Sequence, residues 1–517
     1  MGQSPDGGDG DGGLSPRYRM LETVRAYGLE RLAEAGEQDQ IRDAFAARYL
    51  DLAETADPQL RTAGQGRWLR ELFTEQDNLL AALRLAITRR DGDAALRFVR
   101  ALGWYWMLRG HPGEPGALAR EVLALHPRER SARTAEARIV CALTSAGPSW
   151  EMDAVHPALA AAVADYRELA HGEPPSNPVA AMGEPMLALY DRDPERAFGV
   201  FDSYLSSPDP WIRAAVPLLR GSFRHMLGSI ESAESGFREA LAAFRALGEA
   251  WGAASVLVQL AELAQLRADY AAAVAALDEA DSFGRKLGAW GDLTYIDGMR
   301  AAVRLRMGDL ERARADLARA ERAASERSAS LDDMGAWLAL VRAEFHCREG
   351  DLAAASASCA KVLAWLDGKP SPWWDGLRAH LRVRAAMVVL QEGDQARCRA
   401  LLAVALGSAA NWVERPALAG VMDAIATFLL RDSEPAGRQE RAALAATLLG
   451  AGHTIRGTFD EGSLDAPGAR EAARALLGGE GFEAAYERGR ALGRDQALAL
   501  ASGAVADPEA AGQVLRR

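Results

Sequence analysis

Apolar residues recur every three to four positions along most of this chain, and the segments with this spacing are long. One of them, AASVLVQLAELAQL, occupies positions 253–266. The spacing matches the 3.6-residue period of an α-helix that buries one face. No comparably long segment alternates apolar and polar residues with the two-residue period of a β-strand. The pattern therefore predicts an all-α protein.

A short polar turn interrupts this helical pattern six times. The turns begin at positions 192, 228, 268, 308, 350 and 393, so their spacings are 36, 40, 40, 42 and 43 residues. Each contains a residue whose side chain can accept a hydrogen bond from the first turn of a helix, as N-cap residues do. These residues are Asp193, Ser229, Asp269, Asp309, Asp351 and Asp394. A turn of this kind ends one helix and begins the next.

The residues around each N-cap support this interpretation. Glycine precedes the cap in four of the six turns, as expected where a helix ends in a left-handed residue. Pro194 suits a first helical position, where its missing N–H costs nothing. Four residues after each cap stands a small residue, which lets two helices approach closely: Ala197, Ala233, Ala273, Ala313, Ala355 or Cys398. The sequence thus predicts an α-solenoid of antiparallel helix pairs, in which stacked repeats bury each other's apolar faces.

Charge and cysteine content exclude several classes of protein. The net charge is −12 and the pI is near 5.4, which argues against a duplex-binding surface. The cysteines, at 141, 347, 359 and 398, form neither a CxxC motif nor an even framework, so we expect small buried residues in a reducing cytoplasm. No segment has the ~20 uncharged apolar residues of a membrane span. These features predict a cytoplasmic protein that contacts neither membrane nor nucleic acid.

Motifs of enzymes and cofactor sites are absent from the sequence. There is no GxxxxGK[ST] phosphate loop, no HExxH, no GxSxG and no GxGxxG after a strand. Two pairs of carboxylates, Asp332–Asp333 and Asp191/Asp193, stand at predicted helix starts, where capping explains them. We therefore expect no enzyme activity, no metal and no cofactor in this chain.

Breaks in the pattern divide the chain into five parts. Residues 1–16 are rich in Gly and Asp and are expected to be disordered. Residues 17–110 form a helical N-terminal arm, 111–435 the solenoid, 436–505 a C-terminal helical cap, and 506–517 a disordered tail. In the arm we expect Leu79, Leu83 and Leu85 to be buried and Asn78 to be a hydrogen-bonded structural residue. The GDAAL segment at 92 looks like a further copy of the repeat turn.

Both ends of the chain resemble one family. RYRMLETVRAYGLERLAEAG (17–36), with the WLREL…MLRGH segment at 68–111, is similar to the region after the nucleotide-binding module of AfsR/SARP-type bacterial transcriptional regulators. AALAATLLGAGHTIR (442–456) and GFEAAYERGRALGRDQALALA (481–501) resemble the closing segment of their tetratricopeptide sensor. The resemblance implies a sensor that binds a protein partner or small-molecule effector. It also implies control of an NB-ARC ATPase, the only part that would bind ATP, and of a DNA-binding head.

This chain departs from the family pattern before residue 17. PDGGDGDGGLSPRYRM (5–20) resembles the remains of a winged-helix hairpin, and the ATPase and the DNA-binding head are not in the sequence. We therefore expect a fragment of a longer regulator. Two alternatives remain: a stand-alone tetratricopeptide scaffold, or the sensor region of a LuxR-type ATP-binding regulator. The short polar ending SGAVADPEAAGQVLRR favours the AfsR/SARP arrangement over the LuxR one.

A ladder of tryptophans marks the predicted first helix of successive repeats. Its members are Trp251, Trp290, Trp337, Trp374 and Trp412. Two interpretations are open: the ladder packs neighbouring repeats together, or it forms the aromatic edge of a partner-binding groove. In the second case Arg300 and Arg342, each nine residues before a turn Asp, would donate hydrogen bonds to an acidic peptide or anionic ligand.

Overall fold

The computed structural model describes residues 20–110, 113–146, 152–287, 290–327, 333–368, 374–411, 414–431 and 437–506. Within these ranges the backbone forms α-helices joined by turns and loops, and it contains no β-strand. The predicted all-α class is confirmed. The segments expected to be disordered lie outside the described residues, apart from Ala506, which ends the last helix.

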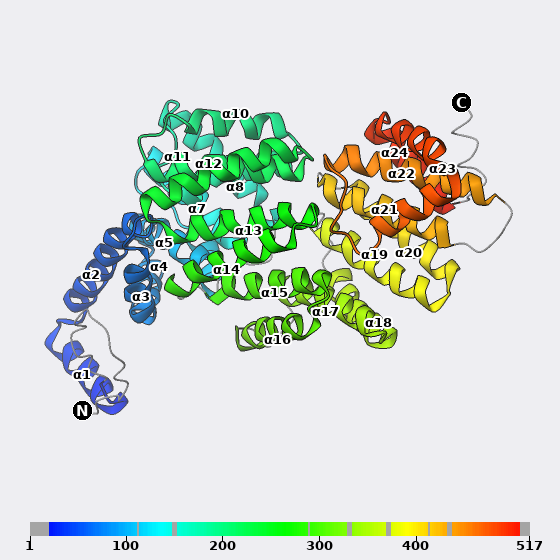
Figure 1. Ribbon diagram of the computed structural model, residues 1–517. Helices are drawn as coiled ribbons and strands as arrows, with labels where there is room; N and C mark the ends of the chain where they lie inside the picture. Colours follow the sequence, from blue (N-terminus) through cyan, green and yellow to red (C-terminus); the bar gives the residue numbers. More distant parts are fainter. Residues whose placement is uncertain are drawn as a thin grey trace.

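The first five helices form the N-terminal arm and its junction with the repeats. They are α1 (Glu22–Ala35), α2 (Gln38–Gln59), α3 (Gln65–Thr74), α4 (Gln76–Thr88) and α5 (Gly92–Leu108). The α1 helix projects from one end of the molecule and packs on α2, whereas α2 packs on α4 and α5 (Figure 1). Leu79 and Leu83 are buried and Leu85 is half-buried. The side-chain amide of Asn78 donates to Glu75 Oε2 at 2.6 Å.

Four less regular helices follow the arm, and the last of them is also the first helix of the first repeat pair. They are α6 (Gly113–Leu123), α7 (Ala132–Ser145), α8 (Met152–Ala170) and α9 (Pro178–Tyr190). The α7 helix packs against α5, α6, α8 and α9, so it joins the arm to the first repeat. One continuous hydrophobic core runs from Leu50 in α2 to Val303 in α15. The arm and the early repeats therefore share a core.

The repeats consist of helix pairs, and each pair has a first helix and a second helix in chain order. The first helices are α9, α11 (Pro210–Met226), α13 (Ala250–Leu266), α15 (Trp290–Met307), α17 (Asp333–Glu349) and α19 (Asp375–Glu392). The second helices are α10 (Pro194–Tyr204), α12 (Ile230–Leu247), α14 (Tyr270–Leu287), α16 (Leu310–Arg327), α18 (Leu352–Asp367) and α20 (Gln395–Ala410). Each first helix packs on the second helix that follows it, and each second helix also packs on the next first helix. The predicted α-solenoid of antiparallel helix pairs is confirmed.

The repeat turn has one backbone geometry throughout. The residue before the N-cap is left-handed in every turn, including Arg192 (φ 59°) and Ala268 (φ 58°), where it is not glycine. The cap N–H then donates to the carbonyl five residues earlier, as Asp269 does to Ala264 at 2.9 Å. This is the Schellman arrangement, and it satisfies a carbonyl at the end of the first helix. The cap residue thus closes one helix and opens the next.

Most caps also use their side chains, and the small residue after them is fully buried. Five Asp side chains accept from a backbone N–H three residues later, at positions 193, 269, 309, 351 and 394. Ser229 makes no such bond, so its turn depends on the backbone alone. The small residues at 197, 233, 273, 313, 355 and 398 are all 0% exposed. Close helix packing therefore occurs at the predicted positions.

The arm contains a further copy of this turn, two residues earlier than the sequence pattern suggested. Arg90 is the left-handed residue (φ 54°), and the side chain of Asp91, not Asp93, accepts from Ala94 N. The expected register at GDAAL is therefore wrong, because the chain can use either Asp as a cap and tertiary packing selects the first. With this register Ala95, four residues after the cap, is 0% exposed like its counterparts in the repeats.

The last four helices are α21 (Arg415–Arg431), α22 (Arg438–Arg456), α23 (Ala466–Arg490) and α24 (Arg494–Ala506). They surround a second core, which begins in α19 and α20. The loop between α22 and α23, residues 457–465, extends back to the ends of earlier first helices; we call it the return loop. Glu461 N donates to Leu266 O at 2.9 Å, and Arg306 Nε donates to Gly462 O at 3.1 Å.

Glycines allow the return loop to approach so closely. A Cβ on Gly462 would lie 1.9 Å from Gln265 O, and one on Gly457 would lie 1.9 Å from Gly228 O. Both distances are far too short for a Cβ atom, so neither position can carry a side chain without moving the backbone. The return loop therefore meets the ends of α11 and α13 through bare backbone and the end of α15 through the Arg306 side chain, and it ties the C-terminal helices to repeats that precede them by about 150–230 residues.

Candidate functional site

Trp251, the first member of the predicted ladder, lies in a cluster of three tryptophans. Its ring meets that of Trp104 edge-on, with centroids 4.8 Å apart, and is stacked 6.5 Å from Trp211. Trp104 comes from α5 and Trp211 from α11, and both are almost fully buried. Such a cluster buries a large apolar area where the arm meets two repeats. Trp251 itself is half-buried.

Two members of this cluster were missed by the sequence analysis. Trp211 stands 18 residues before its cap, Ser229, which is the same offset as that of Trp251 from Asp269. That spacing is a signal that could have added Trp211 to the ladder. Trp104 has no such signal, because α5 is far away along the chain and only the folding of the arm onto the repeats brings it here.

The cluster is joined to the arm by a buried polar contact. The Gln65 side-chain amide donates to Glu249 Oε1 and to Leu60 O, and Trp251 N donates to Gln65 Oε1 at 3.2 Å. Glu249 also accepts from Gly252 N as the N-cap of α13. Burial raises the pKa of the Glu249 carboxyl to about 7, although these hydrogen bonds favour the ionised form. We call this contact the Gln65–Glu249 clasp.

The rest of the ladder does not form one continuous edge. Trp337 is half-buried and its ring lies 4.7 Å from that of Tyr295, whereas Trp374 is buried against Trp365, with centroids 5.5 Å apart. Trp290 begins α15, but its side chain is not among the described ones, and Trp412 lies outside the described residues. Of the described members, Trp251 and Trp337 are partly accessible. The partner-binding role of the ladder stays a prediction.

The two arginines proposed as donors both form ion pairs within the chain. Arg300 is 5% exposed, and its guanidinium contacts Asp278, Asp297 and Asp316 between α14, α15 and α16. Arg342 is exposed on α17 and pairs with Glu321 of α16. The donors of Arg300 are therefore directed at carboxylates of its own chain. A binding role for either arginine remains a prediction.

A different row of side chains crosses four consecutive first helices. The Tyr295 hydroxyl of α15 donates to Glu262 Oε1 of α13 at 2.9 Å. His225 Nδ1 of α11 lies 4.0 Å from Glu262 Oε2, and the Trp337 ring of α17 packs on Tyr295. We call these four residues the inner row. The side chains of His225 and Glu262 retain 16% and 25% of their surface, and both aromatic rings are half-buried, so solvent reaches the row.

The inner row contains an acidic residue, Glu262, whose charge is not balanced by a nearby Arg or Lys in the part of the chain that the structure describes. Within the described residues, no Arg or Lys side chain pairs with Glu262. The pKa of Glu262 is raised to about 7, mainly by burial and to a smaller extent by the charge of Glu414, although the hydrogen bond from Tyr295 lowers it. Burial also lowers the pKa of His225, so this ring supplies little positive charge near neutral pH. The pKa of Tyr295 is raised well above its usual value, mainly by burial, and its hydroxyl stays protonated.

The sequence contained one signal for this row. Glu262 interrupts the otherwise apolar run AASVLVQLAELAQL with a charge, and such a residue is buried only at a cost unless it has a partner. Nothing in the pattern indicated that Tyr295 of the next first helix would reach it.

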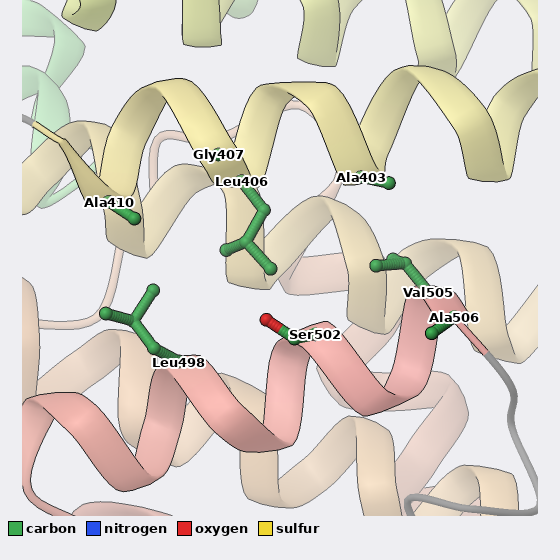
Figure 2. Close-up of a pocket in the computed structure, with 8 residues that line it drawn as sticks. All are labelled: Ala403, Leu406, Gly407, Ala410, Leu498, Ser502, Val505 and Ala506. Carbon is green, nitrogen blue, oxygen red and sulfur yellow. The ribbon is translucent and has the colours of Figure 1, made fainter.

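A hollow of about 350 Å³ lies elsewhere, between α20 and α24 (Figure 2). Its lining is Ala403, Leu406, Gly407, Ala410, Leu498, Ser502, Val505 and Ala506. Ser502 supplies the only side-chain oxygen of this lining, and none of the eight residues titrates. The lining thus offers shape and apolar surface, without a group that could act as an acid, a base or a metal ligand.

Two other kinds of feature are absent from the described part of the chain. No three His, Cys, Asp or Glu side chains come together there in a way that could hold a metal ion. None of the described helices combines the length and apolar character that crossing a membrane requires.

Comparison with known proteins gives a partial match. Over 100 residues the chain is 38% identical to proteins named as HTH-type transcriptional regulators of Mycobacterium tuberculosis and Mycobacterium bovis. The match covers 18% of this chain, which spans only about a tenth of the length of these relatives. No family model matches the chain.

The solved structures that align with most of the chain at low similarity include two α-helical proteins. The P58(IPK) TPR domain covers 71% of this chain and 94% of its own, with 15% identity and a TM-score of 0.19. The alignment with the Cut9–Hcn1 hetero-tetramer of APC/C covers 90% of this chain and 98% of the other, with 12% identity and a TM-score of 0.25.

Proposed function

We propose that this chain is the partner- or effector-binding module of an AfsR/SARP-type transcriptional regulator, and that it controls an upstream NB-ARC ATPase and DNA-binding head. The observation that carries the proposal is the 38% identity with HTH-type transcriptional regulators over 100 residues. The resemblance of residues 17–36, 68–111, 442–456 and 481–501 to the AfsR/SARP family supports it. The α-solenoid architecture also supports it, because it presents a long inner surface to a partner.

The arm offers a surface for the rest of the regulator. Met20, Leu21, Val24, Tyr27 and Leu29 are 45–66% exposed on or beside α1. Clustered apolar side chains of this kind are typical of protein contacts. In this proposal they pack against the upstream part of the regulator.

The Gln65–Glu249 clasp provides a physical route between the two surfaces. It joins α3 of the arm to the start of α13, whose other end carries Glu262 of the inner row. A partner that displaces α13 would therefore act on the arm through a buried hydrogen bond, and such a bond is costly to leave unmade. Control of the upstream part requires that the partner bind the two arrangements with different affinity.

The test uses the chromosomal gene with a tag added at its 3′ end in the native host. We expect a tagged product well above 55.4 kDa that occupies specific DNA sites in chromatin immunoprecipitation. A product near 55 kDa without DNA occupancy would contradict the proposal and favour the stand-alone scaffold. A LuxR-type regulator would reveal itself by a DNA-binding part encoded after this module.

A variant of the clasp tests the proposed route within that product. Gln65→Leu removes both polar contacts with the start of α13 and keeps similar volume, so we expect DNA occupancy to lose its response to inducing conditions. Gln76→Leu is the matched control, because Gln76 bonds Tyr105 within the arm alone. An unchanged response in Gln65→Leu would refute the route.

A further inference from the structure

The inner row combines three features that a cation-binding site requires. A carboxylate, Glu262, has no Arg or Lys partner within the described residues, and Glu414 adds negative charge nearby. Tyr295 donates a hydrogen bond to that carboxylate, and the Trp337 ring packs on Tyr295. All these side chains keep some contact with solvent, so a ligand has access.

We propose that the inner row binds an organic cation, the ammonium or guanidinium group of a lysine or arginine side chain on a polypeptide partner. This inference rests on the proposed partner-binding function and names the chemistry of the partner. The partner then carries a positive charge at this site. The binding role expected of Arg300 and Arg342 would instead have selected an acidic peptide.

The geometry assigns a role to three of the four members. The cation forms a charge-assisted hydrogen bond with the Glu262 carboxylate. Because this carboxylate is partly buried, few water molecules compete with the cation for it. The faces of Tyr295 and Trp337 attract the same cation through their ring quadrupoles, by about 0.5–2 kcal/mol in known cases. The Tyr295 hydroxyl holds the carboxylate in place by donating to it.

Binding is linked to the release of a proton. The groups that face Glu262 are His225 from α11, Tyr295 from α15 and Glu414 before α21. Burial raises the pKa of Tyr295, so its hydroxyl stays protonated, and burial lowers the pKa of His225, which reduces the positive charge on that ring. Because the pKa of Glu262 is about 7, only a tenth of the carboxyls are ionised at pH 6 and nine-tenths at pH 8. A cation that binds the ionised form alone should bind about ninefold more tightly at pH 8.

The experiment uses the isolated chain and titration calorimetry. The probes are a short arginine-containing peptide, the same peptide with citrulline in place of arginine, and free butylamine as the small-molecule source of the same chemistry. We expect the arginine peptide to bind, to bind about ninefold more tightly at pH 8 than at pH 6, and to release protons on binding. The citrulline peptide should bind at least tenfold more weakly. Tighter binding of butylamine than of the peptide would contradict a polypeptide source.

Two variants assign the binding to this site. Glu262→Gln keeps the shape and the Tyr295 hydrogen bond, and it should weaken peptide binding at least tenfold and abolish its pH dependence. Glu239→Gln, on the exposed face of α12, is the matched control and should change neither. Equal binding by Glu262→Gln, or binding that weakens as the pH rises, overturns the proposal. Such a failure leaves DNA occupancy by the tagged regulator unaffected, so it is distinct from a failure of the proposed function.

Discussion

Gln65 and Glu249 are hydrogen-bonded to each other in the interior although 184 residues separate them in the chain. Both side chains are about 1% exposed, and the contact holds the arm against the start of α13. The carboxyl has little solvent to stabilise its charge, which is why its pKa is raised. We therefore expect the junction of arm and repeats to be sensitive to pH.

The first prediction concerns that sensitivity. The pKa of Glu249 is about 7 in the folded chain and near 4.5 when unfolded, so the folded form binds more protons between these values. The contribution of the carboxyl to stability is therefore present below pH 4.5 and lost as the pH rises through 7, by up to about 3 kcal/mol. Glu249→Gln should remove this loss. Hydrogen exchange of the first α13 amides from pH 5 to 8, measured in both chains, checks it; parallel pH profiles would contradict it.

The second prediction compares two repeat turns, one with alanine and one with glycine at the left-handed position. Ala268 has a Cβ where φ is 58°, so Ala268→Gly should stabilise its turn by about 0.5–1 kcal/mol. Gly350 has open space around its Cβ position and φ of 80°, so Gly350→Ala should cost about 1 kcal/mol from backbone strain alone.

Chemical denaturation of both variants, with hydrogen exchange at the two turns, measures these effects. The two substitutions should act with opposite sign. A loss of stability in both would mean that side-chain contacts rather than backbone conformation govern these turns.

The third prediction tests the return loop. A Cβ at Gly462 would collide with Gln265 O, a backbone atom that cannot rotate away, so Gly462→Ala should detach the loop and cost about 1–3 kcal/mol. Amide exchange should rise in 457–465 and at the last turn of α13. Gly468→Ala is the control, because nothing lies within 4 Å of its Cβ position in α23. Equal protection in the two variants would show that the contact is dispensable.

The fourth prediction separates the two interpretations of the tryptophan ladder. Trp251→Ala opens the cluster with Trp104 and Trp211, and we expect a loss of about 3–5 kcal/mol in the free energy of unfolding with unchanged peptide binding. Trp337→Leu keeps apolar volume but removes an aromatic face from the inner row, so it should weaken peptide binding several-fold with a smaller loss of stability. If Trp251→Ala weakened peptide binding and Trp337→Leu did not, the binding surface would lie at the tryptophan cluster.

Local chemistry explains why much of the fold could be predicted. The position of each repeat turn depends on a few neighbouring residues, since an Asp cap and a left-handed residue act within one or two turns of helix. The buried column from Ala197 to Cys398 follows from the same register. The GDAAL turn shows the limit of this reasoning: Asp91 and Asp93 are both competent caps, and the choice between them was made by packing.

The sequence by itself thus determined the helices, the turns, the pairing of neighbours and the acidic charge of the chain. Only the tertiary structure decided that Arg300 pairs internally, that Trp104 joins Trp251, that the return loop reaches Leu266, and that Tyr295 meets Glu262. The physical reason is that each repeat rotates a little relative to the last, and small rotations add up along a solenoid. Which distant residues meet depends on that sum, which no local pattern specifies.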